Sequence, residues 1–182
     1  RYGMTELGMS LSNPYEGERR PGHVGQPLPG VAIKRVSESG EDITDPAAPG
    51  ELAVKSRTAF REYWGNPEST EKAFADGWFL TGDIAVIDEG AYRILGRASI
   101  DIIKSGGYKL SALEIEATLL EHPDVSEVAV IGVPDDEWGE IVAAAVVLAN
   151  SVSEDDLVQW SRERMSGYKV PRRWIFTDAL PR

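Results

Sequence analysis

Residues 22–95 consist of short apolar runs separated by residues that favour turns, and this spacing favours strands. Residues 88–90 predict a hairpin turn, and Asn66 followed by Pro67 predicts the start of the one helix in this region. The spacing predicts a small barrel or sandwich. Four runs have the composition of strands: residues 31–36, 51–54, 84–87 and 91–94.

After Gly96 the pattern changes. Ser111 and Glu114 form a capping box, which predicts a helix through about Glu121. Ser153 predicts the start of a second helix. We expect the first helix to bury one apolar face, made of Leu113, Ala117 and Leu120, and the second to turn inward Leu157, Trp160 and Met165.

Strands are also expected in this second region, at residues 102–110 around a Gly-Gly turn and at 125–133, 141–148 and 174–176. Helices packed on one small sheet predict an α+β domain. The boundary between the two patterns lies at Gly96-Arg97, which gives domains of residues 1–96 and 97–182.

Composition excludes several classes of function. The 182 residues contain no cysteine, which excludes disulfides, thiolate metal sites and a cysteine nucleophile. His23 and His122 are too few and too far apart for a histidine metal site or triad. The formal net charge of -11 opposes nonspecific binding to nucleic acid or anionic lipid, but it does not oppose a nucleotide. No apolar run is long enough for a membrane span.

The segment YGMTE, at residues 2–6, offers an aromatic ring, a hydroxyl and a carboxylate on a backbone loosened by Gly3. These groups suit base stacking, phosphate contact and Mg²⁺ binding. Alone the signal is weak, because such residues occur by chance in many loops. The first twenty residues predict the end of a strand that runs into a loop.

The segment GWFLTGD, at residues 77–83, predicts a tight turn followed by the carboxylate of Asp83. An aspartate at such a place suits the two hydroxyls of a ribose. It could equally cap its own turn, and composition alone favours this simpler interpretation.

Residues 96–109 combine cations with a glycine turn. A Gly-rich turn lets the backbone approach a ligand closely, and flanking cations suit a phosphate or a developing oxyanion. An ordinary hairpin with solvated lysines is a serious alternative, since the pattern is no known phosphate-binding fingerprint. The residues concerned are Arg97, Lys104, Gly106, Gly107 and Lys109.

The basic, proline-containing stretches 168–172 and 180–182 near the end of the chain suit a solvated, turn-rich tail equally well.

The chain resembles the adenylate-forming superfamily, which includes acyl-CoA synthetases, the adenylation domains of peptide synthetases and firefly luciferase. The resemblance lies in the order and spacing of six segments and covers nearly the whole chain: YGMTE, PLPG, GEL, GWFLTGD, DIIKSGGYK and EIE. Malonyl- and methylmalonyl-CoA synthetases look most similar, in the RYGMTE opening, in the stretch that ends at Gly30 and in the GGYK hairpin.

This resemblance implies that ATP and a carboxylic acid form an acyl-adenylate and pyrophosphate, and that CoA then attacks the adenylate. It implies ATP, Mg²⁺ and CoA as substrates, and the cytoplasm, or the mitochondrial matrix of a eukaryote, as location. The implied fold is the end of a large AMP-binding domain, with a distorted β-barrel subdomain, followed by a small mobile α+β domain.

The resemblance also implies roles for matching residues. Tyr2 would stack on adenine, and Asp83 and Arg97 would bind the ribose. Thr5 would contact the α-phosphate. Glu6 would hold Mg²⁺, which offsets charge as pyrophosphate leaves.

In the same way, Lys104 would act in thioester formation, and Gly106 and Gly107 would belong to the CoA path. A hinge would follow Arg97, between Ser99 and Asp101. The spacing from Arg97 to Lys104 is one residue longer than in many members, which is similar to malonyl-CoA synthetases.

The family's catalytic lysine is expected after the end of this chain, and its phosphate-binding loop before the start. We therefore expect the longer parent protein to be the enzyme and the 182 residues alone to be inactive. Two alternatives stay open: an adenylation domain that loads a carrier protein, and a non-catalytic fragment kept for protein contacts. The sequence does not name the acid.

Overall fold

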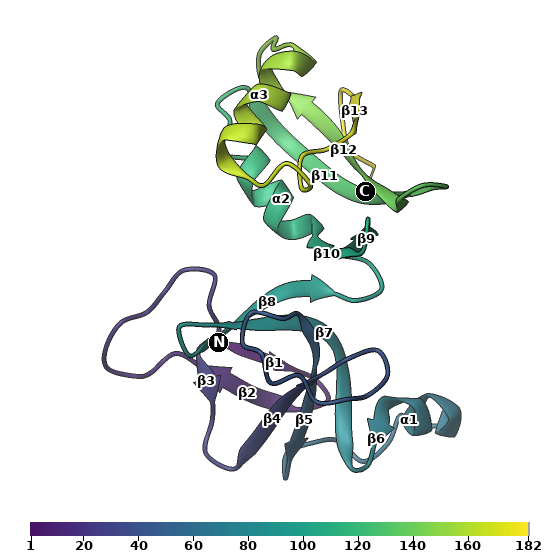
Figure 1. Ribbon diagram of the computed structural model, residues 1–182. Coiled ribbons are helices and arrows are strands. Elements are labelled where there is room, and N and C mark those ends of the chain that lie inside the picture. Colours follow the sequence, from purple (N-terminus) through teal and green to yellow (C-terminus); the bar gives the residue numbers. More distant parts are fainter. Residues whose placement is uncertain (182) are drawn as a thin grey trace. The chain divides into compact units, whose positions relative to one another are not determined.

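The computed structural model describes residues 1–181, and the chain forms two compact units, Arg1–Ala98 and a second from Ser99 onward (Figure 1). The sequence places the domain boundary two residues earlier, before Arg97. In the structure Arg97 is the last residue of strand β8 and pairs across the sheet with Asp83, so the arginine is part of the first unit.

The first unit is built from two antiparallel sheets. The smaller sheet has the order β1-β2-β3: β1 (Tyr2–Met4), β2 (Gly8–Ser12) and β3 (Gln26–Pro27). The larger sheet has the order β4-β5-β7-β6, with β8 also paired to β7: β4 (Val31–Val36), β5 (Gly50–Ser56), β6 (Phe74–Ala75), β7 (Trp78–Asp88) and β8 (Ala91–Arg97). All four predicted strands are confirmed, whereas the β1–β2 hairpin was not predicted.

Local sequence explains the turn and the helix of this unit. Glu89 and Gly90 have φ values of 47° and 81°, the positive sign that a type I′ turn requires, and they join β7 to β8 as predicted. Helix α1 (Pro67–Ala73) begins after Asn66, whose side chain accepts a hydrogen bond from the Ser69 amide at 3.0 Å.

The larger sheet does not close on itself within residues 1–181. β6 and β8 pair with different parts of one edge of β7, while β4 lies at the far end of the sheet and pairs only with β5 among the named strands. The predicted distorted barrel is therefore an open arrangement of two sheets. Both β6 and β8 lie on the edge of β7 opposite β5, and neither pairs with β4.

The two sheets share a core. Leu11 of the small sheet packs with Leu52, Ala85 and Tyr92. A neighbouring cluster joins Leu7, in the turn between β1 and β2, to Val54 and Phe79 of the large sheet. This packing fixes the turn that carries Thr5 and Glu6 against β5 and β7.

The second unit is α+β, as predicted, with a sheet of order β10-β9-β12-β11 and β13 parallel to β12. Both predicted helix caps are confirmed: Ser111 and Ser153 accept from the amides of Glu114 and Asp156. No helix among residues 1–181 has the length and apolar character to cross a membrane. The elements are β9 (Ile102–Ser105), β10 (Tyr108–Ser111), α2 (Ala112–Leu119), β11 (Val125–Asp135), β12 (Gly139–Leu148), α3 (Glu154–Arg164) and β13 (Arg173–Phe176).

The predicted buried face of α2 is wrong. Leu113 and Leu120 are 47% and 49% exposed, and Ala117 is exposed as well. The buried face consists of Ala112, Ile115 and Leu119, which join the core with Leu157 of α3. Two apolar sets run along this helix about 130° apart, and only the position of the sheet and α3 decides between them.

This difference predicts a contrast between two alanine substitutions. Ile115→Ala should lower the free energy of unfolding by about 2–5 kcal/mol, because it leaves a cavity at a side chain that is 1% exposed. Leu113→Ala should change it by no more than about 0.5 kcal/mol. Urea unfolding of the chain, followed by circular dichroism, measures both. Equal decreases in the free energy of unfolding for the two variants would contradict the observed orientation of α2.

Candidate active site

Asp83 is a carboxylate in the middle of β7 that is only 7% exposed. Its partner across the β7–β8 hairpin is Arg97, whose Nε lies 2.8 Å from Oδ1. The Tyr2 hydroxyl donates a hydrogen bond of 2.6 Å to Oδ2. The Asp83 carboxylate of β7 thus links two other predicted site residues, Tyr2 of β1 and Arg97 of β8.

The predicted turn before Asp83 is only partly correct. A tight turn does lie at Asp76 and Gly77, but Asp83 follows several residues later, inside the strand. Gly82 has a φ of +74°, and the pairing of β7 with β5 and β8 shifts register around it. Since the Asp83 carboxylate contacts Tyr2 and Arg97, the interpretation as a cap of its own turn is wrong.

Gly82 also shapes the position of Arg97. The arginine Nη1 donates to the Thr81 carbonyl at 2.8 Å, and a Cβ on Gly82 would lie 3.2 Å from the same nitrogen. The Ala98 amide donates to the Gly82 carbonyl at 2.9 Å. The guanidinium is therefore fixed against β7, while about half of the side chain remains exposed.

Tyr2 acts as a hydrogen-bond donor to Asp83 over the ordinary pH range. Burial raises the pKa of the Tyr2 hydroxyl far above its usual value, and the hydrogen bond to Asp83 raises it further, although Thr81 and Arg97 act in the opposite direction. A phenol that keeps its proton can donate to the carboxylate and hold it in one orientation.

Thr5 and Glu6 lie on the turn between β1 and β2, with Thr5 exposed and Glu6 half-buried. The Tyr63 hydroxyl donates to Oε1 of Glu6 at 3.1 Å. Burial, followed by this hydrogen bond, raises the pKa of Tyr63, and the nearby charge of Arg97 lowers it. Sequence reasoning missed Tyr63, because an aromatic residue in a polar loop carries no signal of its own.

Glu6 fits a magnesium ion that is shared with a substrate. Mg²⁺ in nucleotide sites uses one or two protein carboxylates together with phosphate oxygens and water. Residues 1–181 contain no group of three or more histidine, cysteine or acidic side chains that could hold a metal. The described residues therefore offer no dedicated protein cage, and the Glu6 carboxylate would suit a metal ion whose other ligands come from phosphate and water.

The predicted Gly-Gly turn joins β9 to β10 in the second unit. Gly106 and Gly107 have φ values of 56° and 82°, as a type I′ turn requires. A Cβ on Gly106 would also meet the Trp138 ring at 2.7 Å, whereas a Cβ on Gly107 would meet nothing within 4 Å. Lys104, on β9, is exposed, and its amide donates to Oε2 of Glu140 at 2.6 Å.

Residues 168–172 pack on this hairpin and on α2, so the interpretation as a solvated tail is wrong for them. Tyr168 stacks on Tyr108 with ring centroids 4.6 Å apart. The Lys169 ammonium lies 2.8 Å from Glu114, and Arg172 lies over the Trp138 ring at 3.9 Å. Arg182, at the end of the second basic stretch, lies outside the described residues.

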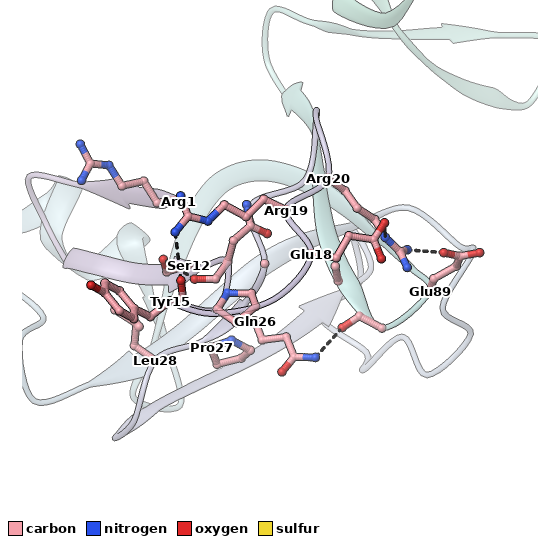
Figure 2. Close-up of a pocket in the computed structure, with 15 residues that line it drawn as sticks. Arg1, Ser12, Tyr15, Glu18, Arg19, Arg20, Gln26, Pro27, Leu28 and Glu89 are labelled. Atoms are coloured by element: carbon pink, nitrogen blue, oxygen red, sulfur yellow. Dashed lines mark hydrogen bonds and ion pairs between the residues drawn. The ribbon is translucent and has the colours of Figure 1, made fainter.

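A cavity of about 750 Å³ lies elsewhere in the first unit, between the loop after β2, strand β3 and the β7–β8 turn (Figure 2). Arg20 and Glu89 form an ion pair there, and Arg19 donates to the Tyr15 carbonyl at 3.0 Å. None of the predicted site residues lines this cavity. We therefore centre the candidate site on Asp83 and Glu6.

Two family models match the chain. Residues 1–64 match the model described as AMP-binding enzyme, and residues 114–182 match the model described as AMP-binding enzyme C-terminal domain. The chain belongs to the AMP-binding enzyme family. The two matches lie on either side of Gly96-Arg97, in the first and the second unit respectively.

Similar proteins agree with this membership. The mitochondrial malonate–CoA ligase ACSF3 of Bos taurus is 47% identical and covers 100% of this chain, which matches 35% of that relative. The long-chain-fatty-acid–CoA ligase FadD13 of Mycobacterium tuberculosis is also 47% identical, over 73% of this chain and 27% of its own length. The crystal structure of ATP-bound MatB from Rhodopseudomonas palustris has a TM-score of 0.87 and 41% identity, over 100% of this chain and 37% of its own. This chain thus spans about a third of the length of these relatives.

The raised pKa of Tyr2 predicts a stability effect at alkaline pH. Below about pH 10 the hydroxyl is protonated in both the folded and the unfolded state, so its contribution to stability is complete. Above this pH the unfolded state loses the proton first, and stability falls as the pH rises toward the folded-state pKa. In Tyr2→Phe this part of the fall should be absent. The urea concentration at the unfolding midpoint, measured between about pH 8 and 11 for the unsubstituted chain and for Tyr2→Phe, tests this prediction. The same pH dependence in both proteins would contradict it.

Proposed function

We propose that this chain is the nucleotide-binding end and small C-terminal domain of an ATP-dependent acid–CoA ligase that activates a malonate-type dicarboxylic acid. The observation that supports this most directly is the buried Asp83 carboxylate, held between Tyr2 and Arg97 in a chain that is similar along its whole length to malonate–CoA ligases. The reaction joins the acid to AMP and then to the CoA thiol.

In this proposal the first unit binds ATP. The Asp83 carboxylate accepts hydrogen bonds from the ribose hydroxyls, since two contacts leave other lone pairs of its oxygens available. Arg97 holds that carboxylate and reaches the ribose from the exposed half of its side chain. The ring of Tyr2 stacks on adenine while its hydroxyl orients Asp83.

Thr5 and Glu6 act on the phosphates in this proposal. The Thr5 hydroxyl, exposed on its turn, donates to the α-phosphate, where negative charge grows as the acid attacks. Glu6 holds the Mg²⁺, and the metal supplies charge neutralisation for the departing pyrophosphate. Their shared turn supports this assignment, because it packs against β5 and β7 through Leu7.

The second unit serves the CoA step in this proposal. The type I′ turn at Gly106 and Gly107 presents backbone without side chains, which suits a narrow pantetheine arm. Lys104 lies on the strand that leads into the turn and supplies a cation for the thioester-forming state.

The acid is the least constrained part of the proposal. A long-chain-fatty-acid–CoA ligase and a malonate–CoA ligase have the same sequence identity to this chain, although the first matches less of it. The malonate assignment rests on similarity along the whole of this chain and on the long spacing from Arg97 to Lys104.

The full-length protein that contains this chain should form malonyl- or methylmalonyl-CoA from the diacid, ATP, Mg²⁺ and CoA. Pyrophosphate release, measured with malonate, methylmalonate, acetate and a long-chain fatty acid, tests the assignment. Faster turnover of acetate or the fatty acid would overturn the substrate and leave the reaction class intact. Absence of pyrophosphate release with every acid would contradict the enzyme itself.

Asp83→Ala in that protein should weaken ATP binding roughly tenfold to a hundredfold, because hydrogen bonds to a charged group contribute about 1.5–3 kcal/mol. Asp88→Ala, at the exposed end of the same strand, is the matched control and should leave ATP affinity unchanged. Isothermal titration with ATP measures both. A folded Asp83→Ala protein with normal ATP affinity would remove Asp83 from the nucleotide site.

A further inference from the structure

The loop between β5 and helix α1 is attached to the β1–β2 turn at several points. The Thr58 hydroxyl donates to the Leu7 carbonyl at 2.7 Å. The Phe60 amide donates to the Glu6 carbonyl at 2.7 Å, and the Tyr63 hydroxyl donates to the Glu6 carboxylate at 3.1 Å. Backbone and side chain of Glu6 are therefore both held by one segment.

Tyr63 is itself held in place from two sides. Its ring packs on Phe60 with centroids 4.7 Å apart, and Phe60 in turn contacts Phe74 and Phe79 of the core. The Tyr63 amide donates to the Thr70 hydroxyl at 2.9 Å, and its carbonyl accepts from the amide of Asn66, the residue that caps α1. The phenol is thus attached to a rigid cluster.

This geometry distinguishes the two oxygens of Glu6. The Tyr63 hydroxyl donates to Oε1, which leaves Oε2 as the oxygen that can face a metal ion. A carboxylate that is free to rotate must lose that freedom when it binds a metal. A carboxylate that a phenol already orients loses less, and its metal affinity is higher for that reason.

We propose that Tyr63 is a positioning residue for the metal-binding carboxylate, and that its hydroxyl sets the affinity of Glu6 for a divalent cation on the nucleotide. This inference rests on the proposed role of Glu6. It extends that role to a residue of a separate loop, which ties the metal site to the start of α1.

The test uses the full-length protein and Mn²⁺ as the probe, bound together with α,β-methylene ATP, which cannot be cleaved to the adenylate. Bound Mn²⁺ is counted by electron paramagnetic resonance, so the measurement does not depend on turnover. Tyr63→Phe, which keeps the ring on Phe60 and removes only the hydroxyl, should weaken Mn²⁺ binding about tenfold. Glu6→Gln should weaken it at least as much, and the double variant no more than Glu6→Gln alone.

Two controls separate the hydroxyl from general effects. Tyr15→Phe removes a phenol hydroxyl from a side chain that is 90% exposed and should leave Mn²⁺ affinity unchanged. Phe60→Leu disturbs the ring packing but keeps the Tyr63 hydroxyl, and it should weaken Mn²⁺ binding much less than Tyr63→Phe.

Each other result overturns a specific statement. Unchanged Mn²⁺ affinity in Tyr63→Phe, with weak binding in Glu6→Gln, rejects the role of Tyr63 and leaves the proposed function standing. Equal losses in Phe60→Leu and Tyr63→Phe show that packing rather than the hydroxyl matters, and they reject the inference too. Unchanged affinity in Glu6→Gln rejects Glu6 as the metal ligand, and the inference fails with it.

Discussion

The pairing of Asp83 with Arg97 across the β7–β8 hairpin organises the candidate site. Its position depends on the turn at Glu89 and Gly90, since a hairpin with a different loop length would bring another residue opposite Asp83. A register shift between Ile84 and Ala85 also contributes, because it places Asp83 opposite Arg97, and the Tyr2 hydroxyl donates to the other oxygen of that carboxylate. The hairpin register brings Asp83 and Arg97 together, and Tyr2 reaches the same carboxylate from β1 of the smaller sheet.

Elements with strong local signals were predictable from the sequence. The caps at Asn66, Ser111 and Ser153 follow from side-chain oxygens that satisfy free amides at a helix start, a requirement that does not depend on the rest of the fold. The turn at residues 88–90 and the Gly-Gly turn were predictable for the same reason, because positive φ restricts the residue type.

Features that depend on distant packing were not predictable. The two apolar sets of α2 have the same helical spacing, so the choice of Ile115 over Leu113 is made by β11 and α3. Strand composition left a barrel and a sandwich open, and it does not indicate that β6 and β8 share one edge of β7, which leaves the larger sheet open. Tyr63 was missed because its importance lies in a contact with Glu6, 57 positions away, which no local pattern indicates.

The two units are linked by a short segment of chain whose ends are held by backbone hydrogen bonds. The Ala98 amide is bonded to the Gly82 carbonyl, which attaches Ala98 to the first unit. The Asp101 carbonyl accepts from the Ala112 amide, which attaches Asp101 to the start of α2. The first bond fixes the peptide plane before the torsions of Ala98, and the second fixes the peptide plane after the torsions of Asp101, so the backbone angles between these two planes can change without breaking either bond. These two bonds are compatible with the proposed hinge between Ser99 and Asp101, where rotation can occur without disturbing Arg97 or the hairpin that carries Lys104.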